Sequence, residues 1–285
     1  MNSIVRRLGV AAAILVGFPI AWAQGDARQG EYLAKAGGCV GCHTDTKPDA
    51  PRFGGGRELV TPFGKFYGPN ITPHPDAGIG RWGEGDFVAA MRFGLRPDGA
   101  HHFPAFPYTS FTKIAEADLK DLYAYLRSLP PSSQPNKSHE LRFPFGLRFL
   151  LRGWKWLYFA PGPFVPDPSR SATLNRGAYL VEALGHCSEC HTPRNFLGGA
   201  KKDRYLAGGR LSEGRTPNLT PTRLKRWSDK QLAEFLRTGA TPEGDVPSES
   251  MEEVIRSTTS QLTAPDLAAI IAYLRSLPPL PEAPK

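Results

Sequence analysis

The sequence predicts a mainly α-helical protein built from two tandem copies of one unit. The octapeptide AYLRSLPP occurs at residues 124–131 and again, unchanged, at residues 272–279. Around each octapeptide, apolar residues recur at the spacing of an amphipathic helix. Each copy also contains one Cys-x-x-Cys-His motif, and the two motifs are 148 residues apart, as the octapeptides are. Self-similarity at a constant spacing indicates a tandem duplication.

Residues 1–23 have the layout of a secretory signal peptide. Arg6 and Arg7 precede an apolar run over residues 8–20, and the small-residue triplet at residues 21–23 follows it. We expect cleavage before Gln24 and a periplasmic location. An uncleaved membrane anchor is the alternative, but the run is short for a helix that crosses a bilayer, which needs about 20 apolar residues.

The charge of the chain argues against nucleic-acid binding. The formal net charge of +8 falls to +6 once Arg6 and Arg7 are removed with the signal peptide. The basic residues are scattered among acidic ones and do not gather on one element, as they would in a nucleic-acid-binding stripe. The mild positive balance is compatible with docking to an acidic partner.

Each copy is predicted to end in an amphipathic helix that runs into its octapeptide. Thr263 and Asp266, with Pro265 between them, are a typical helix start in the second copy, and the Pro-Pro pair that ends each octapeptide is a typical stop. Apolar residues at i, i+3, i+4 and i+7 place one face of each helix in the core. These residues are Leu119, Leu122, Tyr123 and Leu126 in the first copy and Leu267, Ile270, Ile271 and Leu274 in the second.

A shorter helix is predicted after Trp82 in the first copy and after Trp227 in the second. The segments between the helices are rich in Gly and Pro and have little strand character. A unit of about 100 residues with so few aliphatic positions buries only a thin core, so another apolar body must fill it. The core residues of the shorter helices are Phe87 and Met91 in the first copy and Leu232 and Leu236 in the second.

The cysteines identify this body as haem. C-x-x-C-H is the attachment signature of c-type haem. On the first turn of a helix, thiols three residues apart can reach the two vinyl groups of one porphyrin, and the next residue offers an imidazole to the iron. Two covalently bound haem c groups are therefore predicted. The residues that hold them are Cys39, Cys42 and His43 in the first copy and Cys187, Cys190 and His191 in the second, with the cysteines as attachment points and the histidines as iron ligands.

Other uses of four cysteines fit this pattern less well. A disulfide framework is common in exported proteins, and Cys-x-x-Cys also occurs in thioredoxin-like dithiols. Neither use explains a histidine directly after each second cysteine. A zinc site made from all four cysteines would join the copies at one metal and leave each without a core.

We therefore predict two tandem cytochrome c domains, each wrapped around a covalent haem. The first spans residues 24–135 and the second residues 171–280. Residues 136–170 form an aromatic, proline-rich linker, and residues 281–285 form a short tail. The linker carries a charge every few residues, so it is no membrane span. We expect it to pack between the domains; contact with a membrane surface or a dehydrogenase is the weaker alternative.

The chain resembles the multihaem cytochrome c subunits of membrane-associated bacterial dehydrogenases, such as those for alcohols, gluconate or nicotinate. The resemblance covers about residues 25–279. It is carried by GGCVGCHT, FGGGRELVTPFGKFYGPNITPHPDAGIGRW, FPFGLRFLLRGWKWLYFAPGPFVPDP, NRGAYLVEALGHCSECHTPRN and AGGRLSEGRTPNLTP. Those subunits generally carry three haem units and often a C-terminal anchor, whereas this sequence has two haem motifs and ends in LPEAPK.

The resemblance implies a periplasmic electron-transfer protein. Its expected partners are a dehydrogenase as electron donor and an oxidase or smaller cytochrome as acceptor, with peripheral membrane association possible in principle and no nucleic acid. A haem enzyme is the alternative: an open haem 1 could bind peroxide or a small sulfur or nitrogen compound. Ligand sensing without turnover is a third class.

Met251 is the candidate sixth ligand of the second haem. Electron-transfer haems of the c type are usually six-coordinate, and the second axial ligand is often a methionine thioether. Met251 is the only methionine of the second copy and is predicted in a polar loop, SESMEEV, between the middle and last helices. An apolar gap-filling role is the alternative.

The first haem lacks this ligand, because Phe106 stands where the resemblance places a methionine, within P-x-M-P. Met91 aligns with Leu236 on a helical core face, so it cannot easily replace the missing thioether. Either haem 1 has an open or water-bound distal side, or another residue binds the iron. The candidates are His102, which replaces a usually apolar residue, and His101, which the family commonly has beside an intact methionine.

Further residues are predicted to support the haems. Arg57 and Arg210 occupy matching positions and could pair with haem propionates, although an exposed loop role is the usual alternative. Pro193 follows the second motif, and we expect the carbonyl in this region to accept the Nδ1 hydrogen bond that orients His191.

Overall fold

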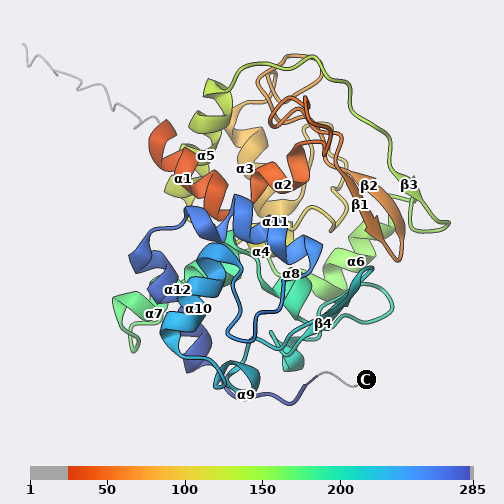
Figure 1. Cartoon of the computed structure of the whole chain (residues 1–285). Helices are drawn as coiled ribbons and strands as arrows, with labels where there is room; N and C mark the ends of the chain where they lie inside the picture. The colour runs from red at the N-terminus through yellow and green to blue at the C-terminus, as the bar shows by residue number, and fades with distance from the viewer. Residues whose placement is uncertain (1–24, 283–285) are drawn as a thin grey trace, which may run out of the picture.

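The computed structural model describes residues 25–282 and shows the mainly α-helical fold that the sequence predicts (Figure 1). The predicted signal peptide lies outside the described residues. The helices of the first copy are α1 (Ala27–Ala36), α2 (Cys39–His43), α3 (Glu84–Phe93), α4 (Tyr108–Phe111) and α5 (Glu116–Ser128). Those of the second copy are α7 (Ala172–Tyr179), α8 (Ser188–His191), α9 (Pro221–Leu224), α10 (Asp229–Thr238), α11 (Glu249–Ser257) and α12 (Ala264–Ser276).

Three short turns of other helix types complete the helical part of the second copy. A π-helical turn, η1 (Leu180–Leu184), continues α7 towards the second Cys-x-x-Cys-His motif. The 3₁₀ turns η2 (Lys202–Arg204) and η3 (Thr259–Gln261) lie in the connections before β4 and before α12. No helix within residues 25–282 is both long and apolar enough to span a bilayer.

Two small antiparallel sheets were missed by the sequence analysis. The first consists of β1 (Glu58–Thr61), β2 (Gly64–Tyr67) and β3 (Glu140–Leu141), and the second of β4 (Gly209–Leu211) and β5 (Gly214–Thr216). Each hairpin turns at a glycine with positive φ, namely 122° at Gly64 and 142° at Gly214. The strands are too short for a clear alternation of apolar residues, which is why the sequence pattern did not reveal them.

The predicted last helices form in both copies. Thr263 is the N-cap of α12, where its side chain accepts a hydrogen bond from the amide of Asp266 (3.3 Å). The predicted core residues of α12 are all buried, as are the three leucines predicted for α5. In α5, however, Tyr125 is buried and Tyr123 only half-buried.

In each copy the first helix crosses the last helix at a glycine. A Cβ atom on Gly30 of α1 would lie 1.9 Å from the carbonyl oxygen of Asp121 in α5. A Cβ atom on Gly177 of α7 would lie 2.0 Å from the carbonyl oxygen of Ala269 in α12. Only glycine allows so close an approach of two helix backbones, so these residues fix the crossing of the two main helices.

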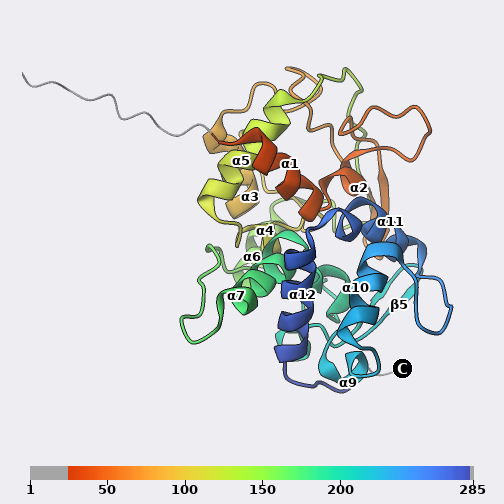
Figure 2. The same ribbon diagram turned by 60° about the vertical axis from the view of Figure 1, so that its left-hand side comes forward.

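The helices of the two copies lie side by side (Figure 2). The copies share one hydrophobic core and hold each other by reciprocal contacts. Tyr32 of α1 donates to the carboxylate of Asp266 in α12 (2.6 Å), and its hydroxyl accepts from the amide of Thr263 (3.3 Å). Tyr179 of α7 donates to Asp118 in α5 (2.5 Å) and accepts from the amide of Ala115 (3.1 Å). Each copy therefore caps the last helix of the other with a tyrosine hydroxyl.

The linker contacts both copies through α6 (Leu150–Tyr158). The Lys155 ammonium donates to the carbonyl oxygens of Phe93 (2.6 Å) and Gly94 (2.9 Å) in the first copy. The Trp154 indole donates to the carbonyl oxygen of Leu197 in the second copy (2.9 Å). Segment 150–158 thus packs against both copies, as the sequence analysis expects of the linker.

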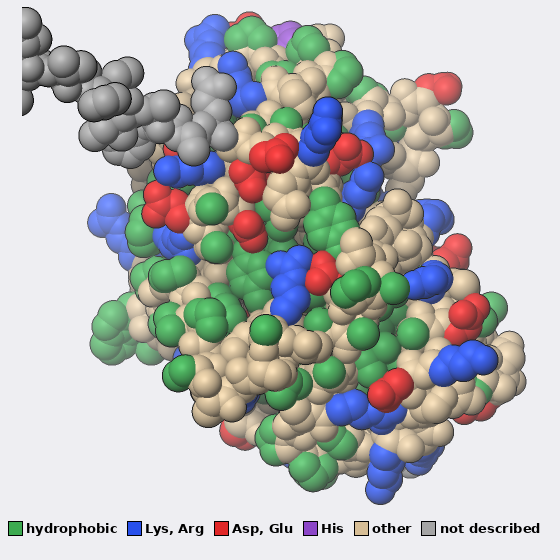
Figure 3. Space-filling model, turned by 90° about the vertical axis from the view of Figure 1, so that its left-hand side faces the viewer, with side chains coloured by type: hydrophobic (Ala, Val, Ile, Leu, Met, Phe, Trp, Pro, Cys, Tyr) green, Lys and Arg blue, Asp and Glu red, His purple; other side chains and the backbone are tan. Residues whose placement is uncertain are grey.

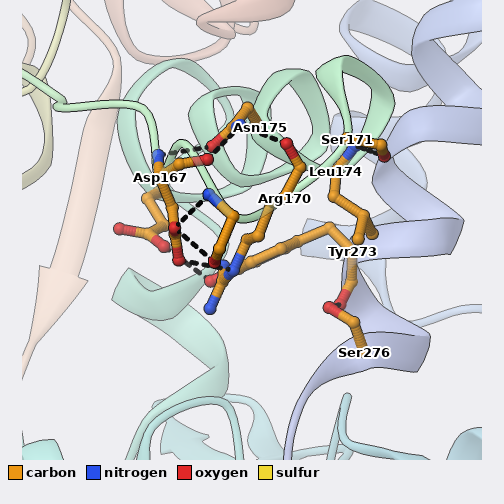
Figure 4. Close-up of polar contacts among 9 residues, drawn as sticks. Asp167, Arg170, Ser171, Leu174, Asn175, Tyr273 and Ser276 are labelled. Carbon is orange, nitrogen blue, oxygen red and sulfur yellow. Dashed lines mark hydrogen bonds and ion pairs between the residues drawn. The ribbon is translucent and has the colours of Figure 1, made fainter.

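The end of the linker is fixed to the start of α7 (Figure 4). The side chain of Asn175 accepts from the amide of Asp167 (2.8 Å) and donates to its carbonyl oxygen (2.8 Å). Asp167 also pairs with Arg170 (3.3 Å), and Ser171 caps α7 by accepting from the amide of Leu174 (3.2 Å). These local bonds set the direction in which the second copy begins.

Candidate functional site

The two Cys-x-x-Cys-His motifs form short helices that start after a left-handed residue. Gly38 (φ 61°) precedes α2, which carries Cys39, Cys42 and His43. His186 (φ 37°) is its counterpart before the second motif, and its Nδ1 lies 2.8 Å from the carbonyl oxygen of Leu184. In both copies one helical turn brings two thiols and one imidazole together.

A backbone carbonyl orients the imidazole of each motif. Nδ1 of His43 donates to the carbonyl oxygen of Pro69 (2.7 Å), and Nδ1 of His191 donates to that of Pro217 (2.8 Å). Because a carbonyl can only accept, Nδ1 carries the proton and Nε2 keeps its lone pair. Burial also lowers the pKa of both imidazoles, which favours this neutral form. The prediction that the carbonyl lies near Pro193 was wrong.

The orienting carbonyl comes from Pro217 and not from Pro193 because the chain runs back beside the motif helix after each hairpin. The segments GPNITP and TPNLTP pass beside the motif helices, whereas the carbonyl of Pro193 accepts from the amide of Lys201 (2.9 Å). Asn70, which follows Pro69, donates to the carbonyl oxygens of Ser132 (2.8 Å) and Gln134 (3.0 Å). The repeated Pro-Asn pair is the signal by which sequence reasoning could have found the orienting carbonyl.

Glycines bring the strands against the motif helices. A Cβ atom on Gly68 would lie 1.7 Å from the carbonyl oxygen of Cys42, and one on Gly209 would lie 2.4 Å from that of Cys190. The hydroxyl of Thr216 donates to the same Cys190 oxygen (2.6 Å). Each motif is therefore held on one side by a glycine-containing backbone that approaches it closely.

The four cysteines are unpaired and half-buried. All four are free, so neither a disulfide within a motif nor one between motifs is formed. Desolvation raises the pKa of Cys39 and Cys187 to about 12 and that of Cys42 and Cys190 to about 11. Within residues 25–282 no group of three or more His, Cys, Asp or Glu side chains is arranged to hold a metal ion.

These features fit one covalent haem at each motif. Such a group needs two thiols to form thioether bonds and a histidine with a free Nε2 to bind the iron. Buried polar atoms without a hydrogen-bond partner among the described residues also adjoin the motifs. The Nε atom of Arg57 is an example, and this side chain interacts electrostatically with Cys42.

Met251 lies in a helix and not in the predicted loop. Ser248 and Glu249 begin α11, in which Met251 occupies the first turn and is half-buried. The loop prediction was wrong because serine followed by glutamates is also a typical helix start. Met251 is thus held on a regular element between α10 and α12.

Phe106 occupies the corresponding region of the first copy, and His102 lies beside it. The ring of Phe106 is 5.2 Å from that of His102 and 5.7 Å from that of Phe111. Nε2 of His102 is buried and has no hydrogen-bond partner among the described residues. Burial, aided by the charges of Arg96 and Arg148, lowers the pKa of His102 to about 4, so its ring is neutral at physiological pH.

His101, in contrast, is engaged by the linker. Its Nδ1 lies 2.8 Å from the ammonium of Lys155, and its carbonyl oxygen accepts from Arg148 (2.7 Å). An ammonium group can only donate, so Nδ1 supplies the lone pair and Nε2 of the neutral ring carries the proton. Neither nitrogen is then free to bind iron unless the contact with Lys155 breaks.

Acidic residues of the second copy contact the first copy near the motifs, and sequence reasoning missed them. Glu253 of α11 pairs with Arg57 (2.6 Å), and a Cβ atom on Gly41 of the first motif would lie 3.3 Å from the Glu253 carboxylate. Arg57 therefore meets a carboxylate of the other copy. Its counterpart Arg210 lies in β4 and is exposed.

The second motif is contacted in the same manner by the first copy. Glu189, between the two cysteines of this motif, accepts from the hydroxyls of Thr109 (3.0 Å) and Ser110 (3.1 Å) in α4. The ring of Phe111, also in α4, lies 5.3 Å from that of His186.

Comparison with known proteins finds one family twice in the chain. A sequence model of the family described as "Cytochrome c" matches residues 27–130 and again residues 174–278. The chain is also similar to a diheme cytochrome c-type protein of Cereibacter sphaeroides, with 46% identity over 261 residues that cover 89% of this chain and 86% of the relative.

Other relatives are parts of dehydrogenases. One of the subunits of the nicotinate dehydrogenase of Pseudomonas putida is 43% identical over 265 residues, which cover 92% of this chain but 22% of the relative. The cytochrome subunit of the fructose dehydrogenase of Gluconobacter japonicus is 39% identical over 260 residues, which cover 90% of this chain and 53% of the relative. The chain thus spans about half or less of these two larger proteins.

Proposed function

Because the chain belongs to the cytochrome c family, we propose that it is a periplasmic dihaem electron carrier that passes electrons from a dehydrogenase to a terminal acceptor. The observation that carries this proposal is that each Cys-x-x-Cys-His motif contacts the other copy within one shared core, Gly41 beside Glu253 and Glu189 with Thr109. Such an arrangement suits transfer between two redox groups.

The residues of the chain would hold one haem c at each motif. Cys39 and Cys42, and likewise Cys187 and Cys190, would form the thioether bonds. A bound haem supplies reversible one-electron reduction of its iron. The carbonyl oxygens of Pro69 and Pro217 fix the rotation of the two histidine rings and raise the basicity of Nε2.

Contacts between the copies would keep the two haems at a constant separation. The pairs of Tyr32 with Asp266 and of Tyr179 with Asp118 tie the main helices together. The ion pair of Arg57 with Glu253 and the hydrogen bonds of Glu189 tie the motif regions. An electron that enters at either copy then reaches the other without a domain movement.

A second candidate function rests on the difference between Met251 and Phe106. Met251 would complete the coordination of haem 2, while the phenyl ring of Phe106 has no lone pair to offer haem 1. Haem 1 would then have either His102 as sixth ligand or an open side that binds a small molecule. The unpartnered Nε2 of His102 suits both roles, as a ligand or as a hydrogen-bonding group beside the bound molecule.

The partner proposal rests on the relatives. Two of them are named as a cytochrome subunit or a subunit of a dehydrogenase, so a dehydrogenase is the proposed electron donor of this chain.

The proposed periplasmic location rests on the signal-like layout of residues 1–23. Fractionation of cells that express the full sequence tests it, because recovery in the cytoplasm without haem would contradict export.

A redox titration of the purified protein tests the central proposal. The visible spectrum should show two haems that accept and release electrons reversibly. A variant with both Cys187→Ala and Cys190→Ala should keep one haem and half of the electron capacity. A protein that cannot be reduced and reoxidised reversibly would show that the chain is no electron carrier.

A further inference from the structure

The outer face of α6 is apolar and has no covering element among residues 25–282. Four side chains on this face are exposed, and we call them the α6 stripe: Phe149 (69% exposed), Leu150 (44%), Trp156 (85%) and Leu157 (56%). At 100° per residue they fall, with Gly153, within one sector of the helix. A short helix that presents two large aromatic side chains to solvent is unusual and indicates a binding surface.

The opposite face of α6 already fixes the helix to the body of the protein. Leu151 is buried in a cluster with Phe66 and Phe103. Trp154 and Lys155 bond the second and first copies, respectively. Because one face holds the helix in place, the α6 stripe faces outward without any rearrangement, and it is available to a partner.

Exposed aromatic side chains of both copies lie next to α6. Phe93 is 45% exposed, and its carbonyl oxygen accepts from Lys155. Phe196 is 84% exposed, and the residue after it bonds Trp154. The apolar surface around α6 therefore includes residues from three segments. It is distinct from the face in Figure 3, where hydrophobic side chains gather over the region of α1, α7 and α12.

The charge around the stripe is positive. From residue 142 to residue 166 the chain has four basic residues, Arg142, Arg148, Arg152 and Lys155, and no acidic residue. Arg152 is exposed and lies at the edge of the α6 stripe. Arg142 is also exposed, whereas Lys155 lies on the opposite face of α6, where its ammonium bonds two carbonyl oxygens and a histidine ring.

We propose that the α6 stripe is the surface by which this protein lies on an anionic lipid bilayer. Trp and Phe beside Arg and Lys are the combination that favours the interface between headgroups and acyl chains. The positive charge complements anionic headgroups, and arginine side chains can extend from an apolar contact to reach them.

Other occupants fit these observations less well. A helix of nine residues is about 14 Å long, so its stripe supplies much less than the roughly 800 Å² per partner that a stable protein complex buries. A second copy of the chain would bring like charges together. A shallow lipid contact needs neither a matching surface nor a large area, and it would keep the protein beside a membrane-bound electron donor. In that sense the inference rests on the proposed function.

Sedimentation with lipid vesicles tests the proposal, with the haem absorbance as the measure of bound protein. The haem-loaded protein should bind vesicles that contain phosphatidylglycerol, and should bind much less to pure phosphatidylcholine or in high salt. Phe149→Ser combined with Trp156→Ser should lower the partition coefficient about tenfold or more. Arg152→Gln should lower it about fivefold on the anionic vesicles only.

Matched controls distinguish binding through this surface from non-specific adsorption to vesicles. Val246→Ser removes an apolar side chain of similar exposure (89%), and Arg237→Gln removes an exposed positive charge on α10; both should leave vesicle binding unchanged. All variants share one N-terminus, so differences report α6 alone. Equal vesicle binding of the α6 variants and the control variants would overturn the proposal. The proposal would also fail if the α6 variants bound vesicles like the wild type and lost only the binding of a protein partner. Electron transfer measured without lipid tests the proposed function separately.

Discussion

At the scale of single residues, we expect the two proposed haem sites to differ because of one exchange. Met251 offers a thioether, whereas Phe106 offers only a ring that packs against His102 and Phe111. A thioether ligand raises the potential of a haem because it stabilises the reduced iron. The two sites are therefore expected to differ in potential and in spin state, although their cysteines and proximal histidines are held alike.

Replacing Met251 should change the second haem alone. In Met251→Ala the potential of that haem should fall by on the order of 0.1 V or more, because axial ligand identity is the main influence on a span of roughly 0.8 V. A redox titration with optical detection measures this shift. The thioether-to-iron absorption band should vanish in the same variant. If potential and band are both unchanged, Met251 does not bind the iron.

Replacing Phe106 should change the first haem alone. If its distal side is open, the reduced protein should bind about one carbon monoxide per two haems, and Phe106→Met should abolish this binding and raise the potential of haem 1. If His102 is the ligand, both haems should be low-spin, and His102→Ala should open the site. Two equivalent haems with His/Met coordination in the wild type would contradict both alternatives.

At the scale of elements, the crossing helices and their tyrosine caps hold the copies together. Asp266 is 8% exposed and accepts hydrogen bonds from Arg176 (2.8 Å) and Tyr32 (2.6 Å). Burial raises the pKa of Asp266, but the hydrogen bonds and the charge of Arg176 outweigh burial, so the net shift is downward. A lowered pKa means that the folded state prefers the ionised carboxylate.

Acid should therefore weaken the contact between the copies. The stabilisation from Asp266 is complete above its pKa in the unfolded chain and is lost as the pH falls through its lower pKa in the folded protein. Asp266→Asn should lower the stability at neutral pH by roughly 1–3 kcal/mol and flatten its dependence on pH below about 4. Melting curves over a pH series measure this, and parallel curves for wild type and variant would refute it.

The elements also show what a sequence can and cannot predict. The last helices were predicted because their apolar residues recur along a single element, and the two motifs because their spacing is local. The carbonyl of Pro217 and the contacts of Glu189 and Glu253 were not predicted, since they join segments that only the folded chain brings together. The sequence analysis predicted a loop at Met251 because the segment SESMEEV is polar, although Met251, Val254 and Ile255 recur at helical spacing in α11.

At the scale of the whole molecule, one core spans both copies, and each haem would complete part of it. The two copies should therefore unfold together. In the variant with Cys187→Ala and Cys190→Ala, calorimetry should show a single transition at a lower temperature than in the wild type, and mass spectrometry should find one covalent haem. Two separate transitions, one at the wild-type temperature, would show that the copies are independent.

The reciprocal tyrosine caps have a consequence for symmetry. One unit alone carries both halves of the contact, the tyrosine on its first helix and the aspartate on its last, so two identical units could pair by the same bonds about a two-fold axis. Residues 136–170 join such a pair covalently. Because the two units are joined covalently, their sequences need not stay identical. One half can therefore have Phe106 where the other half has Met251.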